Sequence, residues 1–74
     1  MKLIGIIGAM EVEVASLKEM MTDVTIRTKA SMEFNHGYLN GKEVVVVRSG
    51  IGKVNAGICT QILVDDYGVD CVIN

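Results

Sequence analysis

The stretch that decides the fold is KLIGIIGAMEVEV at positions 2–14. Its first part, positions 2–8, is an almost uninterrupted apolar run, which is typical of a strand buried on both faces of a parallel sheet. Helical spacing follows at once over positions 10–21. The apolar side of that helix carries Met10, Val14, Leu17 and Met21. A buried strand that passes directly into a helix predicts the opening unit of an α/β domain.

Glu13 is the one residue of this stretch that an ordinary amphipathic helix does not explain. At about 100° per residue its side chain falls between Leu17 and Met20, beside the apolar side of the helix. In an open α/β sheet, ligands bind beyond the carboxyl ends of the strands, and the first turn of the next helix faces that crevice. Two interpretations stay open. Glu13 is either a general base that accepts a proton from water or a hydroxyl, or a first-turn glutamate that favours the helix dipole and bends out to solvent.

The remaining segments predict a mixed α/β layout. We expect strands at about 23–29, 33–39 and 43–48, a helix at 53–67 and a closing strand at 69–74. Asn40-Gly41 is a strong signal for a two-residue hairpin, because both central positions of a type I′ turn need positive φ. The helix at 53–67 is apolar on two sides, which predicts packing on the sheet and on a second surface. Gly68 is placed to end it.

Composition limits the classes of function. The 74 residues are half apolar, without Pro or Trp, and a chain this short buries only about 60–65% of its unfolded surface. So much Val and Ile in a short chain indicates apolar faces that other segments cover, and hence the N-terminal part of a larger α/β domain. The net charge of −2 and the lack of a basic run argue against nucleic-acid binding. No apolar stretch has membrane-spanning length and no signal-peptide pattern is present, so we expect no membrane contact and a cytoplasmic protein.

Three other features favour structural explanations. Cys59 and Cys71 lack metal-ligand spacing and are expected to be buried free thiols. His36 has no partner at a spacing that marks catalysis, which predicts an exposed strand histidine. The glycines of the segment 50–54, GIGKV, do not have phosphate-loop spacing, and this segment is expected to be a tight turn between a strand and a helix.

Two separated motifs resemble one known family. Positions 4–14, IGIIGAMEVEV, and positions 49–56, SGIGKVNA, closely resemble the amino-terminal part of the 5′-methylthioadenosine/S-adenosylhomocysteine nucleosidase family, within the nucleoside phosphorylase superfamily. The resemblance covers essentially the whole chain but about the first third of such an enzyme. It implies a three-layer α/β/α fold with a mixed sheet, truncated here to its N-terminal part, so that residues 1–74 are one part of a single nucleosidase domain.

The resemblance also implies a reaction and roles for particular residues. The reaction is hydrolysis of the N-glycosidic bond of methylthioadenosine or S-adenosylhomocysteine in methionine salvage, by a homodimer without cofactor or metal. Glu13 would orient and deprotonate the attacking water. Ala9 and Met10 would line the pocket near the ribose and the water, and Ile51 would form an apolar wall near the sugar and its 5′-substituent. The preferred 5′-substituent is not decided by this part of the sequence.

Further expectations concern what the chain can do alone. The aspartate that protonates the purine in this family and the glutamate that binds the ribose hydroxyls belong to later segments, so the isolated polypeptide is expected to be inactive. One alternative is a purine nucleoside phosphorylase of the same superfamily, although a glutamate beside the nucleophile would repel phosphate. The other alternative is a non-catalytic fragment that associates with itself through exposed strand edges and apolar surface.

Overall fold

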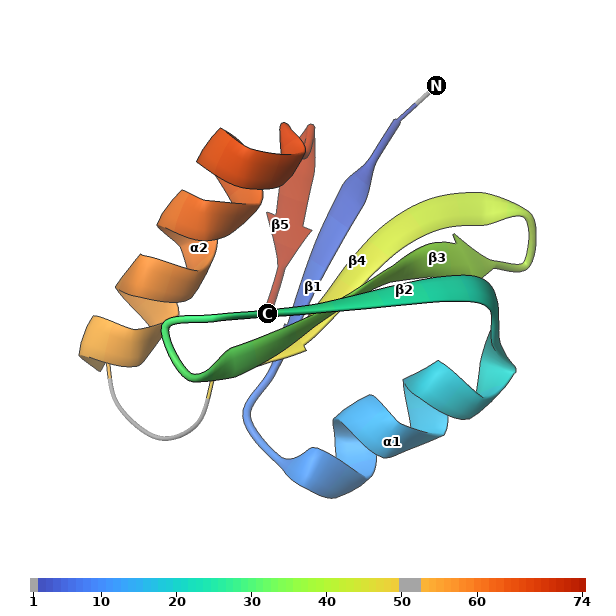
Figure 1. Cartoon of the computed structure of the whole chain (residues 1–74), viewed down its shortest axis with the longest axis horizontal. Helices are drawn as coiled ribbons and strands as arrows, with labels where there is room; N and C mark the ends of the chain where they lie inside the picture. The colour runs from blue at the N-terminus through green and yellow to red at the C-terminus, as the bar shows by residue number, and fades with distance from the viewer. Residues whose placement is uncertain (1, 50–52) are drawn as a thin grey trace.

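The fold is a curved sheet with one helix on each face (Figure 1). The computed structural model describes residues 2–49 and 53–74. In chain order the elements of these residues are β1 (Ile4–Gly8), α1 (Glu11–Met20), β2 (Met21–Lys29), β3 (Met32–Leu39), β4 (Lys42–Arg48), α2 (Lys53–Tyr67) and β5 (Cys71–Ile73).

The predicted segments and the observed elements differ mainly at their ends. β2 starts at Met21, directly after the last residue of α1, rather than at residue 23. β5 covers only Cys71–Ile73 instead of 69–74, because Asp70 bonds to the chain outside the strand ladder. The Asp70 backbone N–H donates to the Leu3 carbonyl at 2.8 Å, and the Asp70 carboxylate accepts a hydrogen bond from the Leu3 N–H at 2.7 Å. These two bonds fix the position at which β5 joins β1.

β1 lies inside the sheet, whose strand order is β2-β3-β4-β1-β5. It pairs in parallel with both β4 and β5, whereas β3 pairs in antiparallel with both β2 and β4. The prediction of a mixed sheet with a buried parallel first strand is therefore confirmed. Because β1, β4 and β5 run in the same direction, their carboxyl ends meet at one edge of the sheet.

The hairpin between β3 and β4 is also confirmed. Asn40 and Gly41 both have positive φ, at 52° and 78°, and the flanking residues pair as Tyr38 with Glu43 and Leu39 with Lys42. The turn between β2 and β3 had no such signal in the sequence. Its two central residues, Ala30 and Ser31, nevertheless have φ of 52° and 62°.

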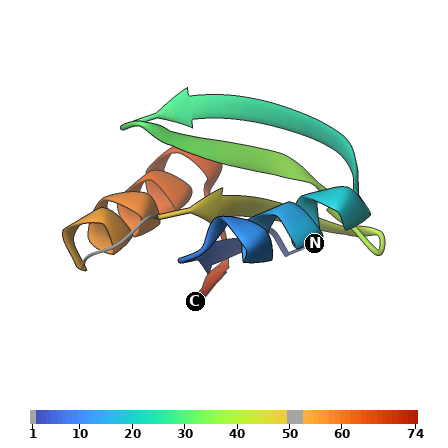
Figure 2. The same cartoon turned by 90° about the horizontal axis from the view of Figure 1, so that it is seen from below.

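The buried residues form one cluster on each side of the sheet, which gives three layers. The valine run of β4 serves both clusters, since successive side chains of a strand point to opposite faces. Val45 and Val47 pack under α2 with Phe34 and Leu63, whereas Val44 and Val46 pack on the α1 side with Val14. Figure 2 shows the two helices with the sheet between them and with β2 and β3 bending away from β4.

α2 packs on the sheet through one side only. Cys59, Ile62 and Leu63 are buried there, while Ile58 and Val64 are 43% and 49% exposed. The second packing surface predicted for this helix thus has no neighbour within the described residues. Gly68 has the expected positive φ of 66° at the end of the helix.

The cysteine prediction was right for Cys59 and wrong for Cys71. Cys59 is buried beneath α2, whereas Cys71 is an exposed free thiol. β5 is the edge strand of the sheet, and Cys71 points to the face opposite Val72, which packs with the buried cluster under α2. Among the described residues, no helix is both long enough and apolar enough to cross a membrane.

Candidate active site

A cleft of about 650 Å³ opens at the edge of the sheet where β1, β4 and β5 end. The ends are held together by the strand register, with Gly8 opposite Arg48, and by a hydrogen bond of 3.1 Å from the Ser49 N–H to the Gly8 carbonyl. The walls of the cleft come from three strand ends and both helices. The lining residues are Ile6, Ile7, Gly8, Ala9, Glu13, Leu17, Ser49, Ala56, Ile73 and Asn74. This location agrees with the crevice beyond the carboxyl ends of parallel strands in which α/β proteins bind ligands.

Glu13 is the one acidic or basic side chain among the described residues of this lining. It is exposed and lies in the first turn of α1. Its Oε1 accepts a hydrogen bond of 3.3 Å from the backbone N–H of Met10. That bond engages one carboxylate oxygen at the start of the helix, and Oε2 has no hydrogen-bond partner in the described part of the chain. A carboxylate in this position can accept a proton from a water held in the cleft.

The apolar side of α1 is less buried than its sequence pattern predicts. Val14 is the only buried residue of the helix, Leu17 is half-buried at the wall of the cleft, and Met10 is 61% exposed. The short helix covers the sheet mainly through Val14, which packs with Val44 and Val46. Glu13 therefore lies next to the best-anchored residue of α1.

Glycine at position 8 allows α1 to lie this close to β1. A Cβ added to Gly8 would lie 2.8 Å from Cγ2 of Val14 and 3.9 Å from Cβ of Glu13. Unstrained carbon–carbon contacts need about 3.5–4.0 Å. The absence of a side chain at the end of β1 thus permits the packing that brings Glu13 to the cleft.

Ala9 and Met10, the other predicted site residues within the described ranges, lie differently with respect to the cleft lining. Ala9 lines the cleft and is exposed. Met10 is not part of the lining, although its N–H holds Glu13. Ile51 lies outside the described residues. Reasoning from the sequence missed Leu17, Ala56, Ile73 and Asn74 as lining residues. Topology offers a signal for the last two, because they stand at the carboxyl end of a strand parallel to β1.

His36 lies outside the cleft lining and is half-buried rather than exposed. Its Nε2 is 2.6 Å from Oε2 of Glu43, and its ring meets the ring of Tyr67 edge-on with 5.6 Å between centroids. These contacts tie α2 to β3 and β4 and give His36 a structural role. In the described ranges, no three His, Cys, Asp or Glu side chains are grouped so that they could hold a metal ion.

Comparison with known proteins identifies the family. A family model described as the phosphorylase superfamily matches residues 3–74. The chain belongs to the phosphorylase superfamily. A curated member, the 5′-methylthioadenosine/S-adenosylhomocysteine nucleosidase of Shewanella loihica, is 58% identical over 71 residues, which are 96% of this chain and 31% of that protein. The chain therefore spans about a third of the length of this curated superfamily relative.

Solved structures of superfamily members agree with the observed fold. The nucleosidase of Colwellia psychrerythraea, solved in complex with adenine, is 52% identical with a TM-score of 0.92, over 96% of this chain and 29% of that one. The nucleosidase of Neisseria meningitidis, solved with methylthio-immucillin-A, is 42% identical with a TM-score of 0.94, over 100% of this chain and 32% of that one. The α/β class with a mixed sheet is thus shared with nucleosidase members of the superfamily.

Proposed function

We propose that this chain is the part of a nucleosidase that supplies the general base for hydrolysis of an N-glycosidic bond. The substrates are methylthioadenosine and S-adenosylhomocysteine, and the products are adenine and a thioribose. The observation that carries the proposal is Glu13, whose carboxylate is the one charged side chain among the described residues that line the cleft where β1, β4 and β5 end. The relatives that share this fold are nucleosidases that bind adenine or a nucleoside analogue, which supports the substrate class.

In the proposed mechanism Glu13 orients a water molecule and removes its proton as the water attacks the anomeric carbon. The Met10 N–H holds Oε1 at 3.3 Å, which leaves the second oxygen to accept that proton. Ala9 contributes the wall near the ribose and the water, and Met10 acts there through its backbone N–H, which holds Glu13. Ile51 contributes an apolar wall near the sugar and the 5′-substituent. Together these residues hold and activate the attacking water and contact the sugar.

Departure of the adenine leaving group needs residues that this chain does not contain. Adenine departs as a neutral base only when a proton reaches it, and the described lining contains no acidic or basic side chain besides Glu13. We propose that the acid for adenine and the contacts to the ribose hydroxyls come from the two-thirds of the relatives that this chain does not span. The 74-residue chain alone should therefore release no measurable adenine from methylthioadenosine.

Location and assembly complete the proposal. The protein acts in the cytoplasm in methionine salvage, and it works as a homodimer, as its resemblance to the nucleosidase family implies. Half-exposed apolar side chains on α2, namely Ile58 and Val64, support a further packing partner for that helix. Sedimentation of a protein in which this chain is joined to the remaining two-thirds of a nucleosidase domain would distinguish a dimer from a monomer.

A chimera tests the role of Glu13. This chain would replace the matching segment of the Shewanella loihica nucleosidase, and adenine release from methylthioadenosine would be measured. We expect an active chimera whose Glu13→Gln variant loses at least about 100-fold in kcat, the lower limit for loss of a general base. Glu11→Gln is the matched control, because Glu11 lies two residues away and faces Arg48 instead. A Glu13→Gln chimera as active as its Glu11→Gln counterpart would refute the role of base.

The same chimera separates hydrolysis from phosphorolysis. Water as the nucleophile predicts free thioribose and a rate that does not depend on phosphate. A sugar phosphate as product, with a rate that rises with phosphate concentration, would assign the reaction to the phosphorylase branch instead.

A further inference from the structure

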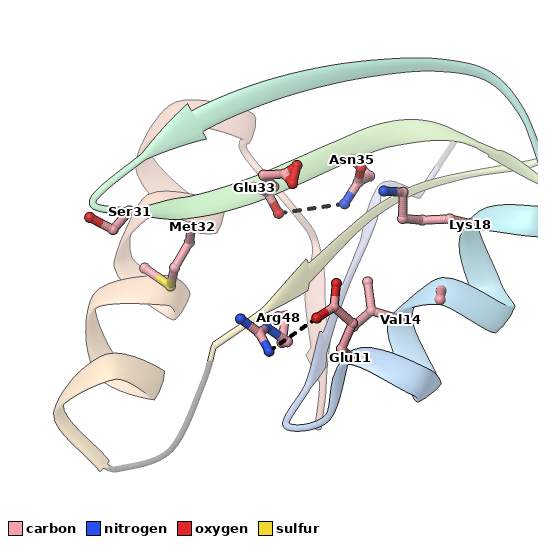
Figure 3. Close-up of a pocket in the computed structure, with 9 residues that line it drawn as sticks. Glu11, Val14, Lys18, Ser31, Met32, Glu33, Asn35 and Arg48 are labelled. Carbon is pink, nitrogen blue, oxygen red and sulfur yellow. Dashed lines mark hydrogen bonds and ion pairs between the residues drawn. The ribbon is translucent and has the colours of Figure 1, made fainter.

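The edge strand β2 takes part in the packing on both sides of the sheet. Its first residue, Met21, follows α1 without a linker and belongs to the buried cluster on the α1 side, together with Val14. Its last residue, Lys29, lies on the α2 side, where its Nζ is 2.6 Å from Oδ2 of Asp66. Figure 3 shows Met32, the β3 partner of Lys29, directed toward the ribbon of α2. One strand thus joins the two helix layers.

A regular strand could not place Met21 and Lys29 on opposite faces. Side chains alternate between the two faces of a sheet, and these two positions are an even number of residues apart. The pairing of β2 with β3 resolves the conflict with a β-bulge, in which Asp23 and Val24 together stand opposite Gly37. The extra residue moves every later side chain of β2 to the other face.

The backbone around the bulge suits its formation. Asp23 has a φ of 54°, in the left-handed region that aspartate adopts more readily than most residues. Gly37 leaves room on the facing strand. A Cβ added to Gly37 would lie 2.8 Å from the carbonyl oxygen of Thr22 and 3.2 Å from Cα of Val24. A side chain at position 37 would therefore collide with the bulged backbone, so glycine there favours the register that places Lys29 on the α2 side.

The last turn of α2 needs the positive charge that β2 brings to it. Asp65 and Asp66 lie in this turn, whose sequence has no lysine or arginine. Carboxylates are unfavourable at the negative C-terminal end of the helix dipole, whereas cations there are favourable. Lys29 supplies one cation through its pair with Asp66. Arg27 supplies another, with its guanidinium carbon 5.8 Å from the centroid of the Tyr67 ring.

We propose that the bulge in β2 is a conformational device that lets one strand brace both helices. The strand before the bulge anchors the end of α1, and the strand after it straps the last turn of α2. Since Glu13 of α1 and Ala56 of α2 both line the cleft, the same strand fixes two of its walls. The Lys29 side chain is 54% exposed, so its ion pair orients α2 more than it stabilises the fold. The proposal does not depend on the nucleosidase function.

The test removes the room for the bulge without altering the residues that it positions. Gly37→Ala should disfavour the bulge and, because Asp23 is still present, turn Arg27 to the other face of the sheet. In nuclear Overhauser spectra of the full chain, the contact between Arg27 and the Tyr67 ring should be lost. The equilibrium constant for unfolding in urea titrations should rise by about tenfold or more, as for other overpacked positions. An Arg27 contact that persists in this variant would overturn the proposal.

Deletion of Asp23 should rescue Gly37→Ala. Without the extra residue, Val24 alone stands opposite position 37, and a regular ladder accepts alanine there. The double variant should regain the contact between Arg27 and Tyr67 and unfold no more readily than the chain with the deletion alone.

Deletion of Thr28 is the matched control for this rescue. Thr28 follows Arg27 in the chain, so its removal leaves the face of Arg27 unchanged and should not restore the contact in Gly37→Ala. If Gly37→Ala alone does not fold, the double variant with Asp23 deleted decides the matter. A folded double variant with the contact supports the device, and a double variant that is unfolded or lacks the contact refutes it.

Discussion

Replacing Gly8 by alanine tests whether the packing of α1 on β1 positions Glu13. The new Cβ would lie 2.8 Å from Val14 Cγ2, so Val14 would have to retreat by roughly 0.7–1.2 Å to reach an unstrained separation. Val14 is 7% exposed and is held against Val44 and Val46. Overpacking of this kind costs about 1–3 kcal/mol of unfolding free energy.

The displacement should affect catalysis as well as stability, because Glu13 precedes Val14 in the chain. A shift of about 1 Å in a catalytic group can cost on the order of 100-fold in rate. Urea unfolding of the chain would measure the first effect, and adenine release by the chimera would measure the second. Gly57→Ala is the control, since apart from the neighbouring residues and the backbone of α2 nothing lies within 4 Å of a Cβ at that position. Inside a helix this change should raise stability by about 0.5–1 kcal/mol instead of lowering it.

A second substitution makes the test specific. Val14→Ala removes the Cγ2 atom that the new Cβ would strike, so Gly8→Ala should cost less stability in the Val14→Ala background than in the native chain. The difference should be about 1–2 kcal/mol, within the usual range for residues in contact. If Gly8→Ala leaves both stability and adenine release unchanged, the contact between Gly8 and Val14 does not determine where Glu13 lies.

Three further predictions concern the core and its edges. Leu63→Ala should lower the unfolding free energy by about 2–5 kcal/mol in urea titrations, because Leu63 is fully buried, whereas Val64→Ala at an exposed position should change it by about 0.5 kcal/mol or less. Burial raises the pKa of the Cys59 thiol from 9.0 to about 11, so the unfolded chain ionises first and stability should fall by up to about 3 kcal/mol between these pH values. Cys59→Ala should lack this loss, and a thiol reagent should label exposed Cys71 in the native chain but Cys59 only after unfolding. Asp70→Ala should cost about 1 kcal/mol in the same urea assay, since it removes the hydrogen bond to the backbone before β1.

The parts of the fold that the sequence predicts are those with local signals. Asn40-Gly41 identifies its hairpin because few residues tolerate positive φ in succession. The turn at Ala30 and Ser31 uses the same backbone region without such residues, and it forms because β2 and β3 pair on either side of it. The exposure of Cys71 also could not be predicted from the residues around it in the sequence. Hydrophobicity indicates that a side chain favours burial, but only the strand order shows whether a neighbour covers it.

The candidate site likewise contains residues that local sequence predicts and residues that only the tertiary fold brings together. The position of Glu13 follows from a strand that runs directly into a helix, so sequence spacing predicts it. Asn74 joins Glu13 only because β5 lies parallel to β1, 60 or more residues later in the chain. A smaller pocket, lined among others by Glu11, Lys18 and Asn35, forms where α1, β3 and β4 meet (Figure 3). Sequence spacing places Glu11 and Lys18 on the helix surface and gives no sign of this pocket.

The distribution of charge at the end of β4 bears on the choice of nucleophile. Arg48 immediately precedes Ser49 in the cleft wall, yet Arg48 does not line the cleft, and its Nη1 lies 3.6 Å from Oε2 of Glu11. The described lining of the cleft consequently contains a carboxylate and no lysine or arginine. Phosphate as a nucleophile needs cations to offset its charge, and a carboxylate beside it raises its energy further. Water carries no such charge, and the proposed role of Glu13 as its base therefore favours hydrolysis over phosphorolysis.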